Sequence, residues 1–270
     1  LTTQAYSDFL KNSNWFDEII VDHRPKVWQI KKWIKLRKIL CAGKFDRVYD
    51  LQTSDRTGWY YKLLGPGSRP EWSGIVDGCS HPHNDPNRDG LHTIDRQRDQ
   101  LLAAGISKSF LPDFSWAKSD LKRFNLPKRF FLMVPGGAPH RPLKRWPAKN
   151  FAIIARNIIS KGLTPVLIGG VSEREAADFI LLNSEKVIDL IGMTSLSDLA
   201  TLARESCGAL GNDTGPMHII AAVGSPCLVL FSDESDHTIT APRGPNVDII
   251  FSRDLSSLIP EKVERRLSIR

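Results

Sequence analysis

The amino-acid sequence predicts an α/β protein that is built on parallel sheets and divided into two domains. Short apolar runs typical of strands alternate with longer amphipathic segments typical of helices, and turns rich in Gly and Pro separate them. Such an alternation favours parallel strands joined by crossover helices. It is interrupted over 111–127 and then starts again. We therefore expect an N-terminal domain over 1–125, a C-terminal domain over 126–255 and a C-terminal helix over 256–270.

The N-terminal domain is expected to consist of short elements. Runs of apolar and aromatic residues predict its strands, and amphipathic spacing predicts its helices. A segment rich in Gly, Pro, Asp and His predicts a long loop. We expect strands over 16–21 and 45–51, helices over 27–40, 57–64 and 96–104, and the loop over 74–90.

The C-terminal domain shows the same alternation more clearly, because its strand-like runs are more apolar. Its helices are bounded by Gly, Pro and polar turn residues. We expect strands over 130–134, 165–168, 187–190 and 209–210, and helices over 148–161, 172–182 and 197–205. Within 208–232 a polar turn, an apolar helix and a further apolar run follow.

The 270 residues carry a net charge of +7, and much of this excess is local. The segment 26–44 holds seven Lys and Arg residues and no acid. Such a segment suits a phosphorylated substrate or the headgroups of an anionic membrane, and it equally suits a solvated basic surface. No module that binds nucleic acid is recognisable, so no nucleic-acid partner is expected.

Transmembrane proteins and metalloproteins are not favoured by the sequence. Its apolar runs fall short of the roughly 18–20 residues that span a bilayer. Its four cysteines form no C-x-x-C pair, which fits a reducing cytoplasm. Histidines gather with Cys79 over 79–92, but their spacing fits no common zinc site, so no metal is expected. No G-x-G-x-x-G follows a predicted strand, and no cofactor is expected.

One polar turn joins a carboxylate to the start of a helix. In GNDTGPMH, over 211–218, Asp213 follows an apolar run, and Thr214 and Gly215 open the helix. Backbone N–H groups, the Thr214 hydroxyl and the His218 imidazole one turn later suit a diphosphate. Asp213 at the rim would then orient sugar hydroxyls or balance a cation. The alternative is that Asp213 is an ordinary N-cap beside a partly buried histidine.

A basic, Gly-rich segment, PGGAPHRPLKRWP, lies between a predicted strand and a predicted helix over 135–147. Gly136 allows the backbone to approach a ligand closely. Lys144 and Arg145 suit the binding of phosphates, because their charge balances the charge that develops on a departing phosphate. The segment is no P-loop, and a basic surface loop is the alternative.

A second Gly-Gly turn occurs in LIGGVSERE, over 167–175, where a strand runs into acidic residues at the start of a helix. Gly170 belongs to this turn, and Glu173 suits hydrogen bonds from ribose hydroxyls. Alternatively, acids in a first helical turn simply complement the helix dipole.

Polar residues also crowd the end of a predicted strand in the N-terminal domain, in YDLQTSDRT over 49–57. Asp50, Gln52 and Arg56 are candidates to face an acceptor. Ordinary turn chemistry is the alternative reading of the same residues.

The motifs stand in an order that is more specific than any one of them. They are YDLQ at 49–52, KRWP at 144–147, the strand and Gly-Gly turn at 165–170, DTGPMH at 213–218 and AAVGSPCLVLFS at 221–232. This set resembles glycosyltransferase family 9, the ADP-heptose:lipopolysaccharide heptosyltransferases and their relatives. The resemblance covers most of the chain and is strongest over 130–232.

The resemblance implies a GT-B fold of two Rossmann-like domains, with a nucleotide-sugar bound by the C-terminal one. It implies inverting, metal-independent transfer of a sugar, typically heptose from ADP-heptose, to a phosphorylated lipopolysaccharide core at the inner face of the cytoplasmic membrane. Lys144 and Asp213 are the catalytic residues by position. The expected donor-binding residues are Gly136, Lys144, Arg145, Gly170, Glu173, Asp213, Thr214, Gly215 and His218.

The sequence departs from the family at its start. The family opens with a strand and a Gly-rich turn holding a Gly-Asp pair, whose aspartate is the expected general base, and no such segment precedes residue 1. The N-terminal domain is therefore expected to lack its first β-α unit. Two alternatives stay open: a non-catalytic module that binds nucleotide-sugar or glycan, and a GT-B-type nucleotide-sugar epimerase.

Overall fold

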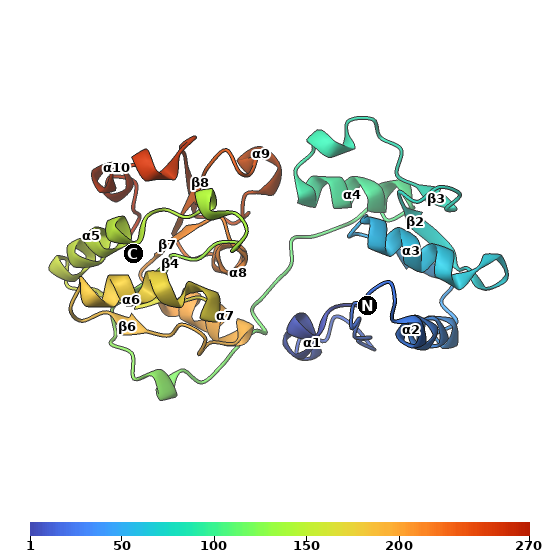
Figure 1. Cartoon of the computed structure of the whole chain (residues 1–270), viewed down its shortest axis with the longest axis horizontal. Coiled ribbons are helices and arrows are strands. Elements are labelled where there is room, and N and C mark those ends of the chain that lie inside the picture. Colours follow the sequence, from blue (N-terminus) through green and yellow to red (C-terminus); the bar gives the residue numbers. More distant parts are fainter. The chain divides into compact units, whose positions relative to one another are not determined.

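The computed structural model describes all 270 residues, and the chain folds into two compact units. Unit 1 comprises residues 1–10 and 16–111, and unit 2 comprises residues 11–15 and 112–270. Figure 1 traces unit 1 in blue to green and most of unit 2 in green to red. Each unit has its own sheet, and the strand pairs of both sheets are parallel. The predicted α/β architecture with parallel sheets is confirmed.

The units divide at residue 111, whereas the sequence placed the boundary near residue 125. The segment between these positions belongs to unit 2 because it binds helix α7 (Leu196–Glu205). Ser119 Oγ donates to Asp198 Oδ1 at 2.5 Å, and Asp198 Oδ2 accepts from the backbone N–H of Ser195, the N-cap residue of this helix, at 2.7 Å. A polar composition predicts a linker, but here the polar side chains fix the segment to the helix.

Unit 1 is built on a small parallel sheet in the order β1-β2-β3. Its strands are β1 (Arg47–Tyr49), β2 (Glu71–Gly74) and β3 (His81–Pro82), and its helices are α1 (Gln4–Lys11), α2 (Ile30–Ala42), α3 (Asp55–Leu64) and α4 (Thr93–Ala103). The core is small and joins α2, α3 and β2. It consists of Leu36, Tyr60, Tyr61, Leu64, Trp72 and Cys79.

Two predictions for unit 1 are wrong. Residues 16–21 form no strand, and only Val21 makes an isolated bridge, with Thr2. A strand forms where a neighbouring strand pairs with its backbone N–H and C=O groups. Beyond the single bridge of Val21 with Thr2, this segment has no such pairing. The predicted loop over 74–90 contains β3, and β2 ends where that loop was expected to begin. Both strands are short and carry Gly or Pro, which weakens the sequence signal.

Unit 2 is built on a six-stranded parallel sheet in the order β6-β5-β4-β7-β8-β9. Its strands are β4 (Phe130–Val134), β5 (Thr164–Leu167), β6 (Ile188–Asp189), β7 (Ala209–Asn212), β8 (Cys227–Phe231) and β9 (Val247–Phe251). Its remaining helices are α5 (Ala148–Ser160), α6 (Arg174–Leu182), α8 (Gly215–Ala222), α9 (His237–Thr240) and α10 (Pro260–Glu264). Strand β9 was not predicted.

The helix expected over 256–270 is confined to α10. The chain leaves the helix after this element because its end binds the turn before β7. The backbone N–H of Arg270 donates to the carbonyl oxygen of Cys207 at 2.9 Å, and its guanidinium donates to that of Ser206 at 2.9 Å.

Both faces of the unit 2 sheet are buried. In β4, Phe131 and Met133 join the core formed with α5, α6 and α10, whereas Phe130, Leu132 and Val134 join the core formed with α7 and α8. A strand that is buried on both faces reads as a continuous apolar run. Helices therefore cover both faces, as in a doubly wound fold.

The strand order of unit 2 begins in the middle of the sheet. The chain runs from β4 through β5 to the edge at β6, and then returns to β7 beside β4, where Val134 pairs with Gly211. The connections of β4 and β7 thus leave in opposite directions. In sheets of this kind a crevice for ligands forms at the carboxyl ends of those two strands. The loops that begin there are 135–147 and 213–214.

Candidate functional site

A buried asparagine holds the loop after β4 in place. Asn212, the last residue of β7, is 0% exposed. Its Nδ2 donates to the carbonyl oxygens of Pro135 and Gly136 at 2.8 and 3.0 Å, and its Oδ1 accepts from the backbone N–H of Trp146 at 3.1 Å. One side chain therefore clamps both ends of the loop 135–147. Sequence reasoning missed it, although Asn212 stands directly before the singled-out Asp213.

The end of this loop is anchored in the core. Trp146 is buried, its Nε1 donates to the carbonyl oxygen of Leu258 at 2.9 Å, and its ring meets Phe151 edge-on with centroids 5.0 Å apart. The buried indole therefore fixes the backbone from which Lys144 and Arg145 extend.

Lys144 and Asp213 form an ion pair at the carboxyl edge of the sheet. Lys144 Nζ lies 2.6 Å from Asp213 Oδ2, and their side chains are only 12% and 9% exposed. Ser235, in the loop after β8, donates its Oγ to the same Asp213 Oδ2 at 2.7 Å. The other carboxylate oxygen, Oδ1, accepts no hydrogen bond within the chain and is available to a ligand.

The start of α8 is open. Thr214 is the N-cap residue, has an extended backbone and makes no side-chain cap hydrogen bond. Asp213 is therefore not the N-cap, contrary to the alternative reading of this turn. A Cβ built on Gly215 meets nothing within 4 Å, and His218, one turn later, is exposed. The structure thus brings Asp213, Thr214, Gly215 and His218 to one end of the helix, beside Lys144.

Glu173 lies close to Gly136, in the loop after β4, and to Gly170, in the turn after β5. It is buried, and its Oε1 accepts from Ser172 Oγ at 2.8 Å. A Cβ on Gly136 would stand 2.6 Å from Glu173 Cγ, and one on Gly170 would stand 3.3 Å from Glu173 Oε2. A residue larger than glycine at 136 would therefore require the Glu173 side chain to shift. The three predicted donor residues Gly136, Gly170 and Glu173 are thus in one place.

Arg145 folds back on its own loop. Its Nη2 donates to the carbonyl oxygen of Gly137 at 2.7 Å, and its Nε is buried without a hydrogen-bond partner. Burying an N–H donor without a partner costs free energy, and an acceptor group on a ligand would remove that cost by accepting a hydrogen bond from this Nε. The neighbouring Arg141 donates its Nη1 to the carbonyl oxygen of Glu234 at 3.1 Å, which ties the loops after β4 and β8 together.

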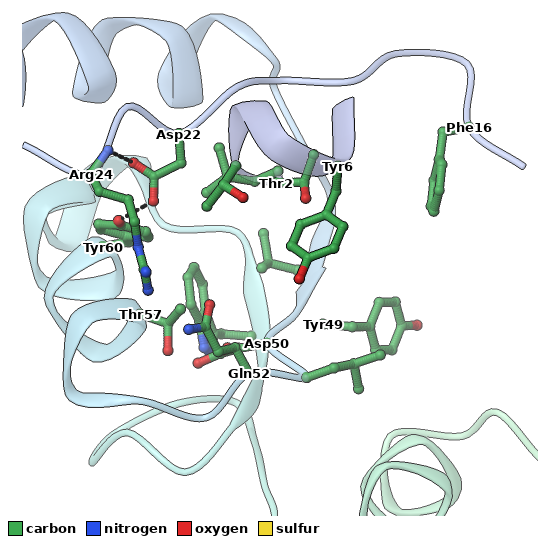
Figure 2. Close-up of a pocket in the computed structure, with 15 residues that line it drawn as sticks. Thr2, Tyr6, Phe16, Asp22, Arg24, Tyr49, Asp50, Gln52, Thr57 and Tyr60 are labelled. Carbon is green, nitrogen blue, oxygen red and sulfur yellow. Dashed lines mark hydrogen bonds between the residues drawn. The ribbon is translucent and has the colours of Figure 1, made fainter. Parts of the chain in front are cut away.

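Unit 1 holds a separate cavity of about 630 Å³, shown in Figure 2. Asp50, Gln52 and Thr57 line it. Asp50 is mostly buried, its Oδ1 accepts from the backbone N–H of Thr53 at 3.0 Å, and burial raises the pKa of its carboxyl. Arg56 does not line the cavity. Of the three predicted acceptor residues, the structure therefore brings Asp50 and Gln52 to this cavity and leaves Arg56 outside it.

Two further residues of this cavity were missed by sequence reasoning. Tyr60 donates its hydroxyl to Asp22 Oδ2 at 2.5 Å, and the other oxygen of Asp22 accepts from the backbone N–H of Arg24 at 2.7 Å (Figure 2). Burial and the Asp22 carboxylate raise the pKa of Tyr60 to about 12. The two residues are 38 positions apart, so no local motif signals their contact.

No group of three or more His, Cys, Asp or Glu side chains is arranged to hold a metal ion. In the loop 79–92, His83 Nε2 instead lies 2.7 Å from Asp99 Oδ2. None of the helices combines the length and the apolar character that a membrane span requires.

Unit 2 is thus a doubly wound α/β domain. Its site combines cations with a carboxylate and lies at the switch point, the carboxyl ends of β4 and β7 where the strand order reverses. Domains of this class bind nucleotides at such a point. The chain belongs to glycosyltransferase family 9: the family model "Glycosyltransferase family 9 (heptosyltransferase)" matches residues 33–267. The family membership expected from the motifs is confirmed.

Sequence similarity to two named relatives supports this family membership. The chain is 36% identical over 104 residues to lipopolysaccharide heptosyltransferase 2 of Salmonella typhimurium, a match that covers 37% of this chain and 30% of that protein. It is 37% identical over 105 residues to the Escherichia coli protein of the same name, with the same coverage. The matched segment thus spans less than a third of either relative.

A solved structure extends the likeness to nearly the whole chain. The E. coli ADP-heptose lipopolysaccharide heptosyltransferase II structure matches with a TM-score of 0.76 at 21% sequence identity, over 98% of this chain and 86% of that one. At this identity the match concerns the fold, and it confirms the fold class expected from the resemblance.

Proposed function

We propose that this chain is an inverting, metal-independent glycosyltransferase that moves heptose from ADP-heptose onto a lipopolysaccharide core or a related glycan. The family membership and the names of the relatives support the reaction class. The observation that carries the proposal is the ion pair of Lys144 and Asp213 at the switch point of unit 2, beside the open start of α8.

The donor diphosphate binds where the positive groups gather. Lys144 Nζ contacts the phosphates and balances the charge that grows on the diphosphate as it leaves. The first N–H groups of α8 add the positive end of the helix dipole, and Gly215 leaves room for a phosphate to approach them. The unpaired Nε of Arg145 and the side chains of Thr214 and His218 supply further donors.

Asp213 serves the sugar and the lysine together. Its Oδ2 holds Lys144 and Ser235, which leaves Oδ1 to accept a hydrogen bond from a sugar hydroxyl. A carboxylate at an anion site is therefore explained: it fixes the position of the cation and orients the uncharged part of the donor. On the nucleoside side, Glu173 accepts from ribose hydroxyls at the end of β5, and its position under Gly136 and Gly170 is consistent with this role.

The acceptor side belongs to unit 1. The cavity lined by Asp50, Gln52 and Tyr60 offers hydrogen-bonding groups beside aromatic rings, a combination that suits a sugar. The acceptor is a phosphorylated glycan of the inner face of the cytoplasmic membrane, and the basic segment 26–44 fits its charge. No cofactor, metal or nucleic acid takes part in the proposed reaction.

The donor assignment can be tested by thermal unfolding of the full chain with ADP, ADP-heptose, UDP-sugars and NAD in parallel. A ligand at about 100 times its Kd adds about 2.7 kcal/mol of stability, which shifts Tm by several degrees. We expect shifts with ADP and ADP-heptose that disappear in Lys144→Ala and persist in Lys149→Ala, an exposed lysine on the neighbouring helix.

Three other results would each change the proposal. A shift of Tm with UDP-sugars alone would contradict ADP-heptose as the donor. Binding of ADP-heptose without release of ADP in the presence of a lipopolysaccharide core would identify a binding module rather than a transferase. Isomerisation of the nucleotide-sugar without an acceptor would identify an epimerase.

A further inference from the structure

The start of α2, the residues just before it and the neighbouring α3 form an exposed apolar surface. Five large apolar side chains form it, which we call the α2 surface: Val27, Trp28, Ile30, Ile34 and, from α3, Trp59. They are 85%, 73%, 67%, 51% and 62% exposed. Single exposed apolar residues are ordinary on a soluble protein, but five on two neighbouring segments need an explanation.

The orientation of α2 is fixed by its other face. Leu36 is buried, and Trp33, Leu40 and Cys41 pack against the core of unit 1. Arg37 also anchors the helix, because its guanidinium donates to the carbonyl oxygens of Leu63 and Leu64 at 3.0 and 3.2 Å. The helix is therefore held firmly in this orientation. Its opposite face already packs against the core of unit 1, so the α2 surface stays exposed.

A row of lysines runs beside the apolar row. Lys31, Lys35 and Lys38 are spaced so that they share one side of the helix, next to Ile30 and Ile34. All three are exposed, and none is in an ion pair. The segment 26–44 contains no acid that could neutralise them. The result is an apolar strip bordered by unpaired positive charge.

The surface is also hollowed. Val27, Trp33, Trp59, Lys62 and Leu63 line a depression of about 390 Å³ between α2 and α3. Lys62 Nζ lies 5.3 Å from the centre of the Trp59 ring. Apolar side chains with a lysine among them suit an acyl chain whose headgroup is anionic.

We propose that the α2 surface docks the chain on an anionic lipid bilayer. Helices that lie in a membrane interface combine an apolar strip with adjacent Lys and Arg, and tryptophan favours the level of the headgroups. Lysine near an anionic bilayer is attracted by its surface potential. A protein partner fits less well, because lysine is depleted in protein–protein interfaces. In the proposed function, which gives this docking its purpose, the acceptor lies in the same membrane.

The test is sedimentation of the full chain with vesicles of phosphatidylcholine, with and without phosphatidylglycerol. We expect binding only when the anionic lipid is present, with affinity falling about tenfold or more in Lys31→Glu/Lys35→Glu. Trp28→Ser/Trp59→Ser should bind more weakly at every lipid concentration. Matched controls are Lys128→Glu/Lys149→Glu and Leu182→Ser, which are exposed positions of unit 2 and should bind like the unchanged chain.

Each variant is also melted with and without ADP, so that loss of folding is separated from loss of docking. A second measurement asks whether Trp28 enters the bilayer: quenching of tryptophan fluorescence by brominated lipid should fall in Trp28→Phe. The proposal would be overturned by equal binding to neutral vesicles or by binding of a soluble phosphorylated glycan in place of vesicles. Unchanged binding by both Lys31→Glu/Lys35→Glu and Trp28→Ser/Trp59→Ser would also overturn it. Vesicle binding by a chain that shows no ADP shift would contradict the donor assignment and leave the docking surface standing.

Discussion

Lys144 and Asp213 are 69 positions apart in the sequence and meet at 2.6 Å in the fold. They meet because the strand order places β4 and β7 side by side, so that the loops that follow them begin at the same edge of the sheet. The pair is nearly closed to solvent, and Asp213 holds the ammonium in position without a ligand. A positioned charge reorganises little during a reaction, and this is the main source of electrostatic catalysis.

In the proposed reaction, Lys144→Ala should lower kcat of heptose transfer by about 10²–10³-fold, because it removes the cation that is proposed to stabilise the departing diphosphate. Lys144→Arg should recover part of the loss, since it keeps the charge but not the geometry of the pair. Release of ADP in steady-state assays measures the effect. An unchanged kcat in Lys144→Ala, with Lys149→Ala as the control for a neighbouring lysine, would remove Lys144 from the mechanism.

Ser235 should act as a positioning residue for Asp213. Its hydroxyl donates to Oδ2, the oxygen that also binds Lys144, and so keeps Oδ1 toward the ligand. We expect Ser235→Ala to lower kcat/KM about tenfold and Ser235→Thr, which retains the hydroxyl, to recover most of it. If Thr and Ala variants lose activity equally while melting like the unchanged chain, the hydroxyl has no such role.

Asn212 should matter for stability. Its side chain makes three hydrogen bonds at full burial, so Asn212→Ala leaves two carbonyl oxygens and one N–H of the loop 135–147 unpaired. We expect a loss of about 2–4 kcal/mol in the free energy of unfolding, measured in urea. Asn246→Ala, which removes one exposed hydrogen bond to Gly224, is the matched control and should cost less than about 1 kcal/mol.

Sequence reasoning predicted the strands of unit 2 that are buried on both faces and missed the short strands β2 and β3 of unit 1. Strands β4 and β8 read as continuous apolar runs, because helices cover both sides of the sheet. Strands β2 and β3 are short and polar, and only their parallel neighbours show them to be strands.

For the candidate site, too, only residues that belong to a local motif could be predicted from the sequence. Lys144 and Asp213, which form an ion pair, were singled out as candidates because each stands in a local motif after a strand. Asn212 and Ser235 were missed because their roles depend on partners between 22 and 77 positions away. No periodicity or spacing reports such contacts, which exist only once the strand order is known.

Asp198 should give unit 2 an acid-sensitive element. Burial favours the neutral carboxyl, but hydrogen bonds from Ser119, Ser195 and Arg123 outweigh it and lower the pKa of Asp198 below its usual value of 3.8. A carboxyl whose folded pKa is lowered contributes stability above the unfolded pKa, and this stability is lost as the pH falls through the folded pKa. We therefore expect the free energy of unfolding to decrease as the pH is lowered below about 4.

The part of this decrease that belongs to Asp198 can be isolated with variants. Asp198→Asn should be less stable than the unchanged chain at neutral pH and should show a flatter dependence on pH below about 4, because its side chain no longer binds a proton. Ser119→Ala removes one of the hydrogen bonds that hold the charged form, so its pH dependence should lie between the two. Urea unfolding between neutral pH and about pH 3 measures all three chains. Equal slopes for the unchanged chain and Asp198→Asn would show that the carboxylate does not fasten the segment 112–129 to α7 through its charge.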